Sequence, residues 1–462
     1  MLSELFDHID GRRDEYIDRL RRWVAVPSIS STGEGMDRAP AAAAGLLGEL
    51  GFAARPLDAG AGWPAVFGDR PADRPGPTVL LYGHYDVQPP GDPAEWTSPP
   101  FQAEVRDGRI YGRGTADNKG QHLAALLAVD AVARVTGGVG CHVKVLLDGE
   151  EEICSPHLAA IAEAHRELLT ADLAIWADGP VHESGRWALV FGVRGALTFE
   201  VEASGAASDL HSGNWGGVAP NAAWRLVHAL GSLRDADGRI LVDGWDDTVP
   251  ELGELERATL AEHEPDPAAL LAGIGADALD GPPGRSIGDR LAAYPTLSVN
   301  GLSSGHTGPG IRTVIPHRAV ARCDIRLVPG QRAGTVWPLI RDHLQRQPGI
   351  TARLLMSAEA SGTPMDSPWT APIAAGMRDA QGEPPVLLPP QGGTLPISPL
   401  TDELGLPTFG VPCANVDENN HAPDENLDLD RFLTGVKSIA AILLRLEAYS
   451  PPSGSREPTN DW

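Results

Sequence analysis

The sequence predicts an α/β protein with a mostly parallel central sheet flanked by helices, into which a smaller α+β domain is inserted. Three observations support this fold class. Short apolar runs alternate with helical stretches in the first part of the chain, and the pattern changes to alternating strands near residue 192. In addition, a chain of 462 residues is longer than one ordinary core requires.

The first part of the chain has the pattern of a parallel sheet. Apolar runs at residues 79–82, 143–147 and 173–177 are short and end at polar or turn residues, as buried strands do. A helix is predicted over residues 120–135, between the first two runs. Because a strand, a helix and another strand in this order are typical of parallel pairing, we assign residues 1–191 to the first part of the main domain.

The segment from residue 192 to residue 362 is the predicted insertion. Its predicted strands and helices cover residues 196–203, 221–233, 296–299, 322–328 and 335–345. This mixture indicates an α+β domain. Within it, residues 235–290 are rich in Asp, Glu, Gly and Pro and form an acidic insert with a helical piece at 252–263.

The last part of the chain completes the main domain. Helices are predicted over residues 371–379 and 430–449, so that residues 363–450 form the second part of this domain. Residues 451–462 have the composition of a flexible tail.

Composition excludes several classes of partner. The formal net charge of -25 should repel phosphate backbones, so nucleic acid is not an expected partner. The four cysteines form no CxxC pair, which predicts neither a disulfide framework nor a thiolate zinc site and fits a reduced cytoplasm. No segment has the ~20 consecutive apolar residues that a membrane span needs.

Acidic and imidazole side chains follow all three strands of the predicted parallel sheet. His84 and Asp86 come after the first, the run Asp-Gly-Glu-Glu-Glu at residues 148–152 after the second, and Asp178 after the third. Each alone also fits an ordinary turn. Because open α/β sheets build their sites at the carboxyl ends of strands, the three together predict one polar site.

Two loops add to this inventory. Asp117 lies in a glycine-rich segment before a helix, where it also fits a helix cap, and His421 lies in a polar loop. Two histidines and several carboxylates suit zinc, cobalt or manganese better than magnesium. One carboxylate shared by two cations would make a bridging water acidic, and an unligated Glu would then take its proton.

Several motifs resemble one known family over nearly the whole chain. They read, in order, GHYDVQP, YGRGTADNKGQ, DGEEEICSP, GVRGALTFEVE, DLHSGNWGG, TVIP, RLVPGQ and NNHAPDENL. The sequence thus resembles the dinuclear zinc amidohydrolases, which include carnosine-type and nonspecific dipeptidases, aminoacylases and glutamate carboxypeptidases. It is most similar to the dipeptidase branch.

The resemblance implies a role for each polar residue of the main, catalytic domain. His84 and Asp178 would hold one metal ion, Glu152 and His421 the other, and Asp117 would bridge the two. Asp86 would orient His84, and Glu151 would be the general base. The family also implies a cis peptide bond between Asp117 and Asn118. The two ions are expected to be Zn²⁺, with Mn²⁺ or Co²⁺ as alternatives.

The resemblance also identifies the insertion as a lid and dimerisation domain. His211 would reach the active site of the neighbouring subunit in a homodimer and stabilise the tetrahedral oxyanion. The residues expected to bind substrate are Thr313, Arg326, Gly393 and Thr394. The chain departs from the family at Cys154, where relatives usually carry Gly, so we expect a stiffer loop after Glu152.

The expected activity is hydrolysis of the amide bond of a small carboxylate-bearing substrate, most simply a dipeptide. An N-acyl-amino-acid deacylase would use the same metals and the same base, and the sequence leaves this alternative open. A non-catalytic binding protein on the same scaffold is disfavoured, because Glu151, Asp117 and the remaining ligand set are all present.

Overall fold

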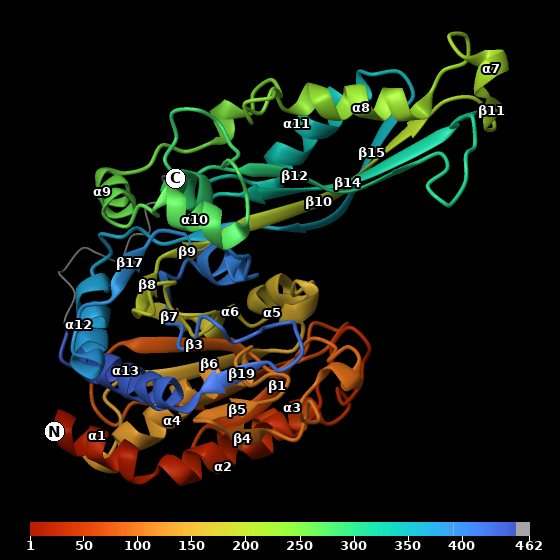
Figure 1. The fold of residues 1–462 in the computed structure, drawn as a ribbon. Helices are drawn as coiled ribbons and strands as arrows, with labels where there is room; N and C mark the ends of the chain where they lie inside the picture. The colour runs from red at the N-terminus through yellow and green to blue at the C-terminus, as the bar shows by residue number, and fades with distance from the viewer. Residues whose placement is uncertain (391, 450–462) are drawn as a thin grey trace. The chain divides into compact units, whose positions relative to one another are not determined.

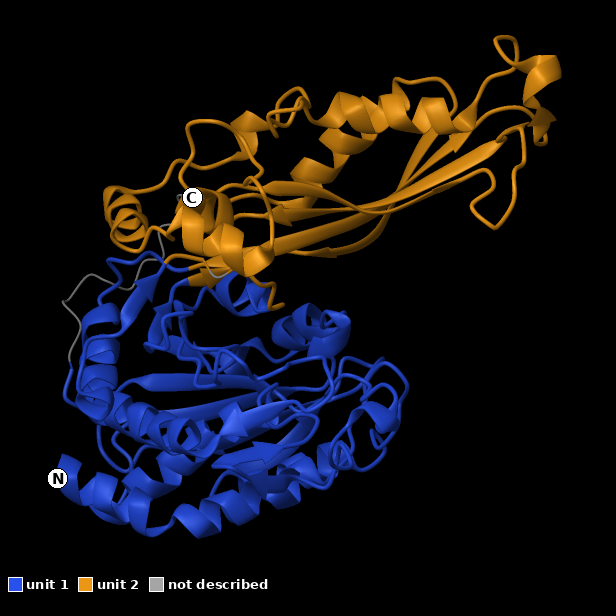
Figure 2. Cartoon of the chain, in the orientation of Figure 1, with its two compact units in different colours: residues 1–191, 363–388, 397–461 blue, residues 192–362, 389–396, 462 orange. Residues whose placement is uncertain are grey.

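The computed structural model describes residues 1–390 and 392–449, which divide into two compact units (Figures 1 and 2). Unit 1 comprises residues 1–191, 363–388 and 397–449, and unit 2 comprises residues 192–362 with 389–396, apart from residue 391. The predicted flexible tail, residues 451–462, lies outside the described residues.

Unit 1 is built on a sheet that has eight strands within the described part of the chain. In spatial order these are β1 (Ala53–Leu57), β2 (Ala65–Arg70), β6 (His142–Asp148), β3 (Thr78–His84), β7 (Leu173–Trp176), β18 (Thr408–Gly410), β8 (Ala188–Val190) and β17 (Val386–Leu388). The central strands β6, β3, β7 and β18 run parallel. The predicted fold class is therefore confirmed.

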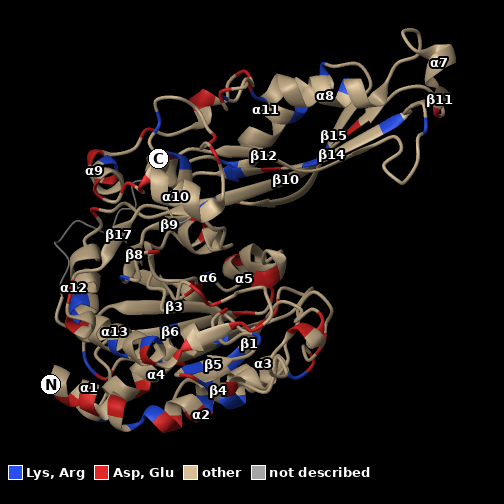
Figure 3. Cartoon of the chain, in the orientation of Figure 1, with Lys and Arg blue, Asp and Glu red and all other residues tan. Residues whose placement is uncertain are grey.

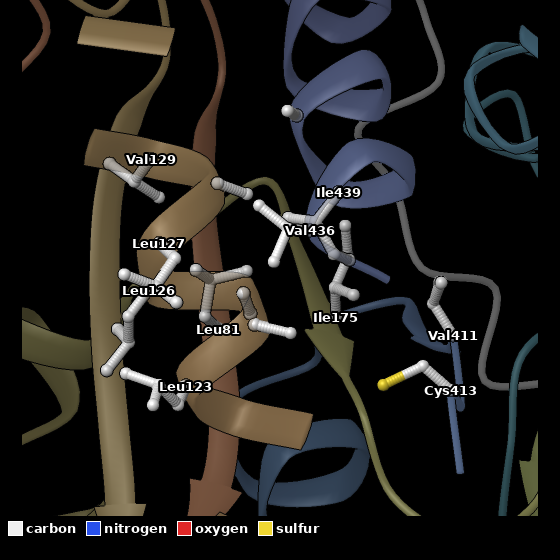
Figure 4. Close-up of a cluster of buried hydrophobic side chains, with 14 of the residues drawn as sticks. Leu81, Leu123, Leu126, Leu127, Val129, Ile175, Val411, Cys413, Val436 and Ile439 are labelled. Atoms are coloured by element: carbon white, nitrogen blue, oxygen red, sulfur yellow. The ribbon is translucent and has the colours of Figure 1, made fainter. Parts of the chain in front are cut away.

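Helices pack on this sheet directly or on the helices that cover it. They are α1 (Leu2–Gly11), α2 (Arg13–Val24), α3 (Ala39–Glu49), α4 (Lys119–Thr136), α5 (Leu158–Ala164), α6 (Arg166–Leu169), α12 (Thr370–Gln381) and α13 (Leu429–Glu447). Leu123 and Leu127 of α4 and Val436 of α13 meet Leu81 of β3 and Ile175 of β7 in one apolar cluster (Figure 4). Helix α4 is buried on nearly every side, and its buried residues include polar ones such as His122 in its first turn.

The register of the parallel strands aligns their carboxyl ends. His84 pairs with Asp148 between β3 and β6, and Tyr82 pairs with Trp176 between β3 and β7. The residues that follow each strand therefore leave the sheet at the same edge, as expected for a site in an open α/β sheet. A separate three-stranded sheet of β4 (Glu104–Arg106), β5 (Arg109–Tyr111) and β19 (Asn426–Asp428) joins the C-terminal segment to the start of the glycine-rich loop.

Unit 2 has its own antiparallel sheet and core. The strands, in spatial order, are β12 (Thr296–Ser304), β14 (Arg318–Leu327), β10 (Gly195–Ser204) and β15 (Ile350–Ala358). Helices α8 (Ala222–Leu233) and α11 (Ala333–Gln345) pack on this sheet. The fourth strand, β15, was not among the predicted elements, and β12 extends five residues beyond the predicted end at residue 299.

The acidic insert of unit 2 is peripheral to that core. It contains α9 (Glu254–Glu262) and α10 (Pro267–Ile274), and Figure 3 marks acidic positions on α9.

The remaining elements are β9 (Gly192–Val193), β11 (Leu210–His211), β13 (Val314–Ile315), β16 (Ser361–Gly362), α7 (Ser212–Trp215) and the short turns η1 (Pro93–Glu95), η2 (Glu151–Ile153), η3 (Asp246–Thr248), η4 (Asp289–Ala293) and η5 (Pro399–Glu403). Over residues 1–390 and 392–449, none of the helices has the length and apolar character needed to cross a membrane.

Candidate metal centre

Unit 1 brings all the predicted metal ligands to one edge of its sheet. His84 ends β3, Asp178 follows β7 by two residues, and Glu152 lies in the turn η2 just after β6. Asp117 precedes α4, and His421 lies in the loop before β19. Potential ligand atoms of His84, Asp117 and Glu152 lie within 4.8 Å of one another.

Asp117 lies between the two imidazoles. Its Oδ1 is 3.1 Å from His84 Nε2, and its Oδ2 is 3.0 Å from His421 Nε2. The peptide bond between Asp117 and Asn118 is cis, as the family resemblance implies. One carboxylate thus presents a separate oxygen to each histidine, which is the arrangement a bridging ligand requires.

Each imidazole also faces a second carboxylate. His84 Nε2 lies 3.4 Å from Asp178 Oδ2, and His421 Nε2 lies 3.2 Å from Glu152 Oε2. The carboxylate of Glu151 is 3.8 Å from His84 Nε2. The centre therefore has two ends joined by Asp117, one formed by His84 and Asp178 and the other by Glu152 and His421.

Burial and mutual repulsion dominate the electrostatics of the centre. Burial raises the pKa of Glu151 well above its usual range and the pKa of Glu152 to about 7. Burial disfavours a charge on His84, but Glu151 and Asp117 outweigh it and hold the pKa of His84 well above its usual range. Hydrogen bonds with Asp117 and Glu152 raise the pKa of His421 to about 10. The crowded carboxylates thus require positive charge, supplied by protons or by a cation.

The geometry around His84 fits a metal ion. Its Nε2 is buried and makes no hydrogen bond within the described part of the chain, although oxygens of Asp117 and Asp178 lie 3.1 and 3.4 Å away. Nitrogen and oxygen atoms converging in this way suit a divalent cation that accepts both ligand types. The donor set therefore fits zinc, manganese or cobalt.

Asp86 holds the turn that carries Glu151 and Glu152. Its two carboxylate oxygens accept hydrogen bonds from the backbone N–H groups of these residues at 3.2 and 3.1 Å. His84 Nδ1 lies 3.3 Å from Asp86 Oδ1 and 3.1 Å from the Asp86 carbonyl oxygen. Such a contact at Nδ1 leaves Nε2 facing the cluster, as a metal ligand requires.

Sequence reasoning missed Gln88, which lies in the quoted motif GHYDVQP. Its backbone N–H donates to Glu152 Oε1 at 3.0 Å, and its side-chain amide donates to Glu152 Oε2 at 2.9 Å. Both oxygens of one predicted ligand are therefore held by a single neutral residue. Because Gln88 carries no charge and is not itself a predicted ligand, no feature of the sequence distinguished it.

Sequence reasoning also missed Glu425, which anchors the loop before Asp117. Its carboxylate accepts hydrogen bonds from the backbone N–H groups of Gly114, Ala116 and Asp117 at 3.0 to 3.1 Å. Arg113 Nη1 lies 2.6 Å from Glu425 Oε2, and both side chains are almost fully buried. A buried, fully paired carboxylate of this kind fixes backbone geometry.

Comparisons with known proteins identify the family. The sequence pattern of peptidase family M20/M25/M40 matches residues 80–445. The chain belongs to this family. Beta-Ala-His dipeptidase of Rattus norvegicus is 29% identical over 99% of this chain and 98% of its own length. Cys-Gly metallodipeptidase of Schizosaccharomyces pombe is 30% identical over 97% of this chain and 99% of its own length.

A solved structure agrees with this assignment. An M20 family metallo-carboxypeptidase from Sulfolobus solfataricus superposes with a TM-score of 0.85 and 31% identity, covering 94% of this chain and 100% of its own. The chain is therefore a metallopeptidase of the M20 family that binds divalent metal and acts on a small peptide substrate. The resemblance and the enzyme class inferred from the sequence are confirmed.

In this M20 peptidase, the residues predicted to bind substrate lie in unit 2. Arg326 Nη1 donates to Thr394 Oγ1 at 2.7 Å. The backbone N–H of Arg194 donates to the carbonyl of Gly393 at 3.1 Å, and the buried guanidinium of Arg194 donates to the carbonyl of Arg326 at 3.4 Å. Arg194 was not predicted, although it lies in the quoted motif GVRGALTFEVE. The structure thus joins Arg326, Gly393 and Thr394 in one group.

His211 and Thr313 form a second group within unit 2. His211 lies in β11, which pairs with β13, and Ser212 N–H donates to the Thr313 carbonyl at 3.0 Å. The His211 side chain is exposed, and its Nδ1 accepts a hydrogen bond from Gly213 N–H at 3.0 Å. Its Nε2 thus takes no part in this local contact.

Cys154 follows the metal-ligand turn in an unusual backbone conformation. It caps η2 with φ of 67°, in the left-handed region that glycine adopts without steric cost. A glycine at this position would adopt the same conformation without steric cost. The stiffer loop after Glu152 stays a prediction.

Proposed function

We propose that this M20 peptidase hydrolyses dipeptides at a centre of two divalent ions, which we expect to be Zn²⁺. The observation that carries the proposal is the carboxylate of Asp117, whose two oxygens face His84 and His421 at 3.1 and 3.0 Å. Asp178 and Glu152 would complete the two ends. The names of the relatives, which include a Beta-Ala-His and a Cys-Gly dipeptidase, favour a dipeptide over an N-acyl amino acid.

The chain's own residues would perform the proton transfers. When bound, the two ions would polarise the scissile carbonyl and acidify a water molecule. Glu151, which Asp86 holds through its backbone N–H, would accept the proton of the attacking water and deliver it to the leaving nitrogen as the carbon–nitrogen bond breaks. One amide and one water would thereby become one carboxylate and one protonated amine.

Unit 2 would supply substrate contacts. Arg326, whose guanidinium already donates to Thr394, suits the carboxylate of a dipeptide because arginine forms charge-assisted hydrogen bonds with carboxylates. Thr313 and the backbone of Gly393 would add hydrogen bonds. These roles follow from the family resemblance and from the grouping of Arg326 with Gly393 and Thr394.

A homodimer is the second part of the proposal. Large apolar side chains around α7 and α8 are exposed: Trp215, Val218 and Trp224 expose 48%, 76% and 62% of their surface. Apolar groups concentrated in this way mark an interaction surface more often than a free one. His211, which lies in the same region of unit 2, would act on the partner's site as the oxyanion donor. The cytoplasmic location remains a prediction from cysteine usage.

The test combines metal content with a substrate panel. Purified protein should contain about two divalent ions per chain and should lose turnover when a chelator removes them. Dipeptides should be cleaved in preference to N-acetyl amino acids that carry the same C-terminal residue. Preference for the N-acetyl series would favour the deacylase instead, and full turnover after complete metal removal would contradict the mechanism.

A further inference from the structure

A buried chain of hydrogen bonds runs from α2 to the His84 end of the metal centre. Trp23 Nε1 lies 2.8 Å from His122 Nε2, and His122 Nδ1 lies 3.2 Å from Asn118 Oδ1. An indole N–H only donates, so His122 Nε2 must accept, and the imidazole proton is on Nδ1, directed at Asn118. Trp23 and His122 are only 4% and 3% exposed, so water does not compete for these bonds.

Asn118 is hydrogen-bonded to both segments that carry the ligands of this end, His84 and Asp178. Its Oδ1 also accepts the backbone N–H of His84 at 3.2 Å, and its Nδ2 donates to the carbonyl of Ala177 at 2.6 Å. Ala177 immediately precedes Asp178. One fixed amide therefore sets the separation between the backbone of His84 and the backbone that carries Asp178, and His122 fixes that amide.

The opposite end of the centre has a separate support. Gln88 donates from its backbone N–H and from its side-chain amide to the two oxygens of Glu152, at 3.0 and 2.9 Å, and its amide also reaches the Glu152 carbonyl at 3.2 Å. Glu152 Oε2 is the oxygen that faces His421 Nε2. The hydrogen bonds of Gln88 and those of His122 share no residue.

We infer that His122 and Gln88 are positioning residues for opposite ends of the metal centre, and that each controls the affinity of one ion. This inference rests on the proposed two-metal site. Partners that orient metal ligands typically contribute 10- to 100-fold in metal affinity. Because the two supports are separate, damage to one should weaken one ion and spare the other.

The primary experiment measures both zinc affinities by competition with a chromophoric chelator in His122→Phe and Gln88→Met. Phe fills the imidazole space without hydrogen bonds, and Met matches the length of Gln without an amide. Each variant should bind one ion about 10- to 100-fold more weakly and the other as in the wild type. Equal weakening of both ions, or unchanged affinities, would overturn the inference.

Double variants assign each effect to an end. His122→Phe should weaken the remaining ion when combined with His421→Ala, but should add no further loss to Asp178→Ala, which already lacks that end. Gln88→Met should show the opposite pattern. Additive losses in both backgrounds would mean that His122 and Gln88 act through general stability and not through one end.

Two further variants complete the experiment: one is a control, and the other replaces His122→Phe if that variant does not fold. His142→Gln removes a partly exposed histidine that bonds Asp69 at 2.7 Å, away from the ligands, and should leave both affinities unchanged. If His122→Phe does not fold, Trp23→Phe removes the indole donor together with part of the buried ring system, and should still weaken the same ion and not the other. A wild-type protein that binds no zinc would refute the proposed function, whereas normal wild-type binding with unaffected variants would refute only this inference.

Discussion

Two of the histidines predicted to serve the reaction, His84 and His211, differ sharply in their exposure to solvent. His84 in unit 1 is fully buried, and its neighbours Asp86, Asp117 and Asp178 are hydrogen-bonded or charged groups of the same unit. His211 in unit 2 is exposed, on a two-residue strand. His84 therefore meets its carboxylates within its own unit, whereas the proposed role of His211 requires a second surface.

The largest expected effect lies in unit 1. Glu151→Gln keeps the shape of the side chain but cannot accept a proton, so turnover should fall by about 10²- to 10⁴-fold while both ions stay bound. Steady-state kinetics and metal analysis on the same sample measure the two quantities. Glu163→Gln, an exposed change on α5, is the control. Near-normal rates in the Glu151 variant would assign the base to another residue.

The next effect tests whether the exposed histidine works across subunits. His211→Ala should lose about 10²-fold or more in turnover because an oxyanion donor is missing. Mixed with Glu151→Gln and allowed to exchange subunits, it should recover about a quarter of wild-type activity. Random exchange makes about half the dimers mixed, and one of the two sites in each mixed dimer is whole.

Exchange must be shown independently, by mass spectrometry of differently tagged chains. A mixture that exchanges but stays as inactive as its parents would mean that His211 serves its own chain or has no catalytic role. His84 and His211 would then differ in burial, but not in whether they act within their own chain.

A smaller effect concerns substrate binding in unit 2. Arg326→Lys keeps the charge but loses the planar donor pair, so KM for dipeptides should rise about 10-fold with a lesser change in kcat. Arg322→Lys is a matched control, because Arg322 lies four residues earlier on β14 and is paired with Glu200. Equal effects of both substitutions would indicate a general charge effect and not a carboxylate contact.

The smallest effect should come from Cys154. Replacing it by Gly removes the cost of a left-handed residue with a side chain, about 1 kcal/mol, partly offset by the greater freedom of Gly in the unfolded chain. The free energy of unfolding by urea should therefore rise by less than about 1 kcal/mol. Destabilisation would show that contacts of the Cys154 side chain outweigh the backbone cost.

The sequence was sufficient to predict the sheet edge of the site. Parallel strands align their carboxyl ends, so His84, Glu152 and Asp178 could be expected together from the positions of three apolar runs. Asp117 and His421 lie on loops, so their residue types alone made them candidate ligands. The family resemblance then gave each of them its place in the cluster. Their roles as ligands stay predictions.

The residues that hold the ligands in place could not be predicted from the sequence in the same way. Gln88 and His122 act through hydrogen bonds whose partners are remote in sequence, such as Trp23, which is 99 residues from His122. Strands β8 and β17 were missed because three residues are too few to show a period. Strand β15 was missed although Ile350, Ala352 and Leu354 recur at every second position and pack on the core of unit 2.

The contact between Arg113 and Glu425 has a consequence for biosynthesis. It joins residues 312 positions apart, and Glu425 also holds the backbone of Asp117. During translation, residues 192–362 are complete and can fold before the ribosome has made Glu425 or His421. The metal centre, whose first ligand is His84, therefore assembles only when the last tenth of the chain emerges. A nascent chain released before that point would carry a finished unit 2 beside a unit 1 without its bridging loop in place.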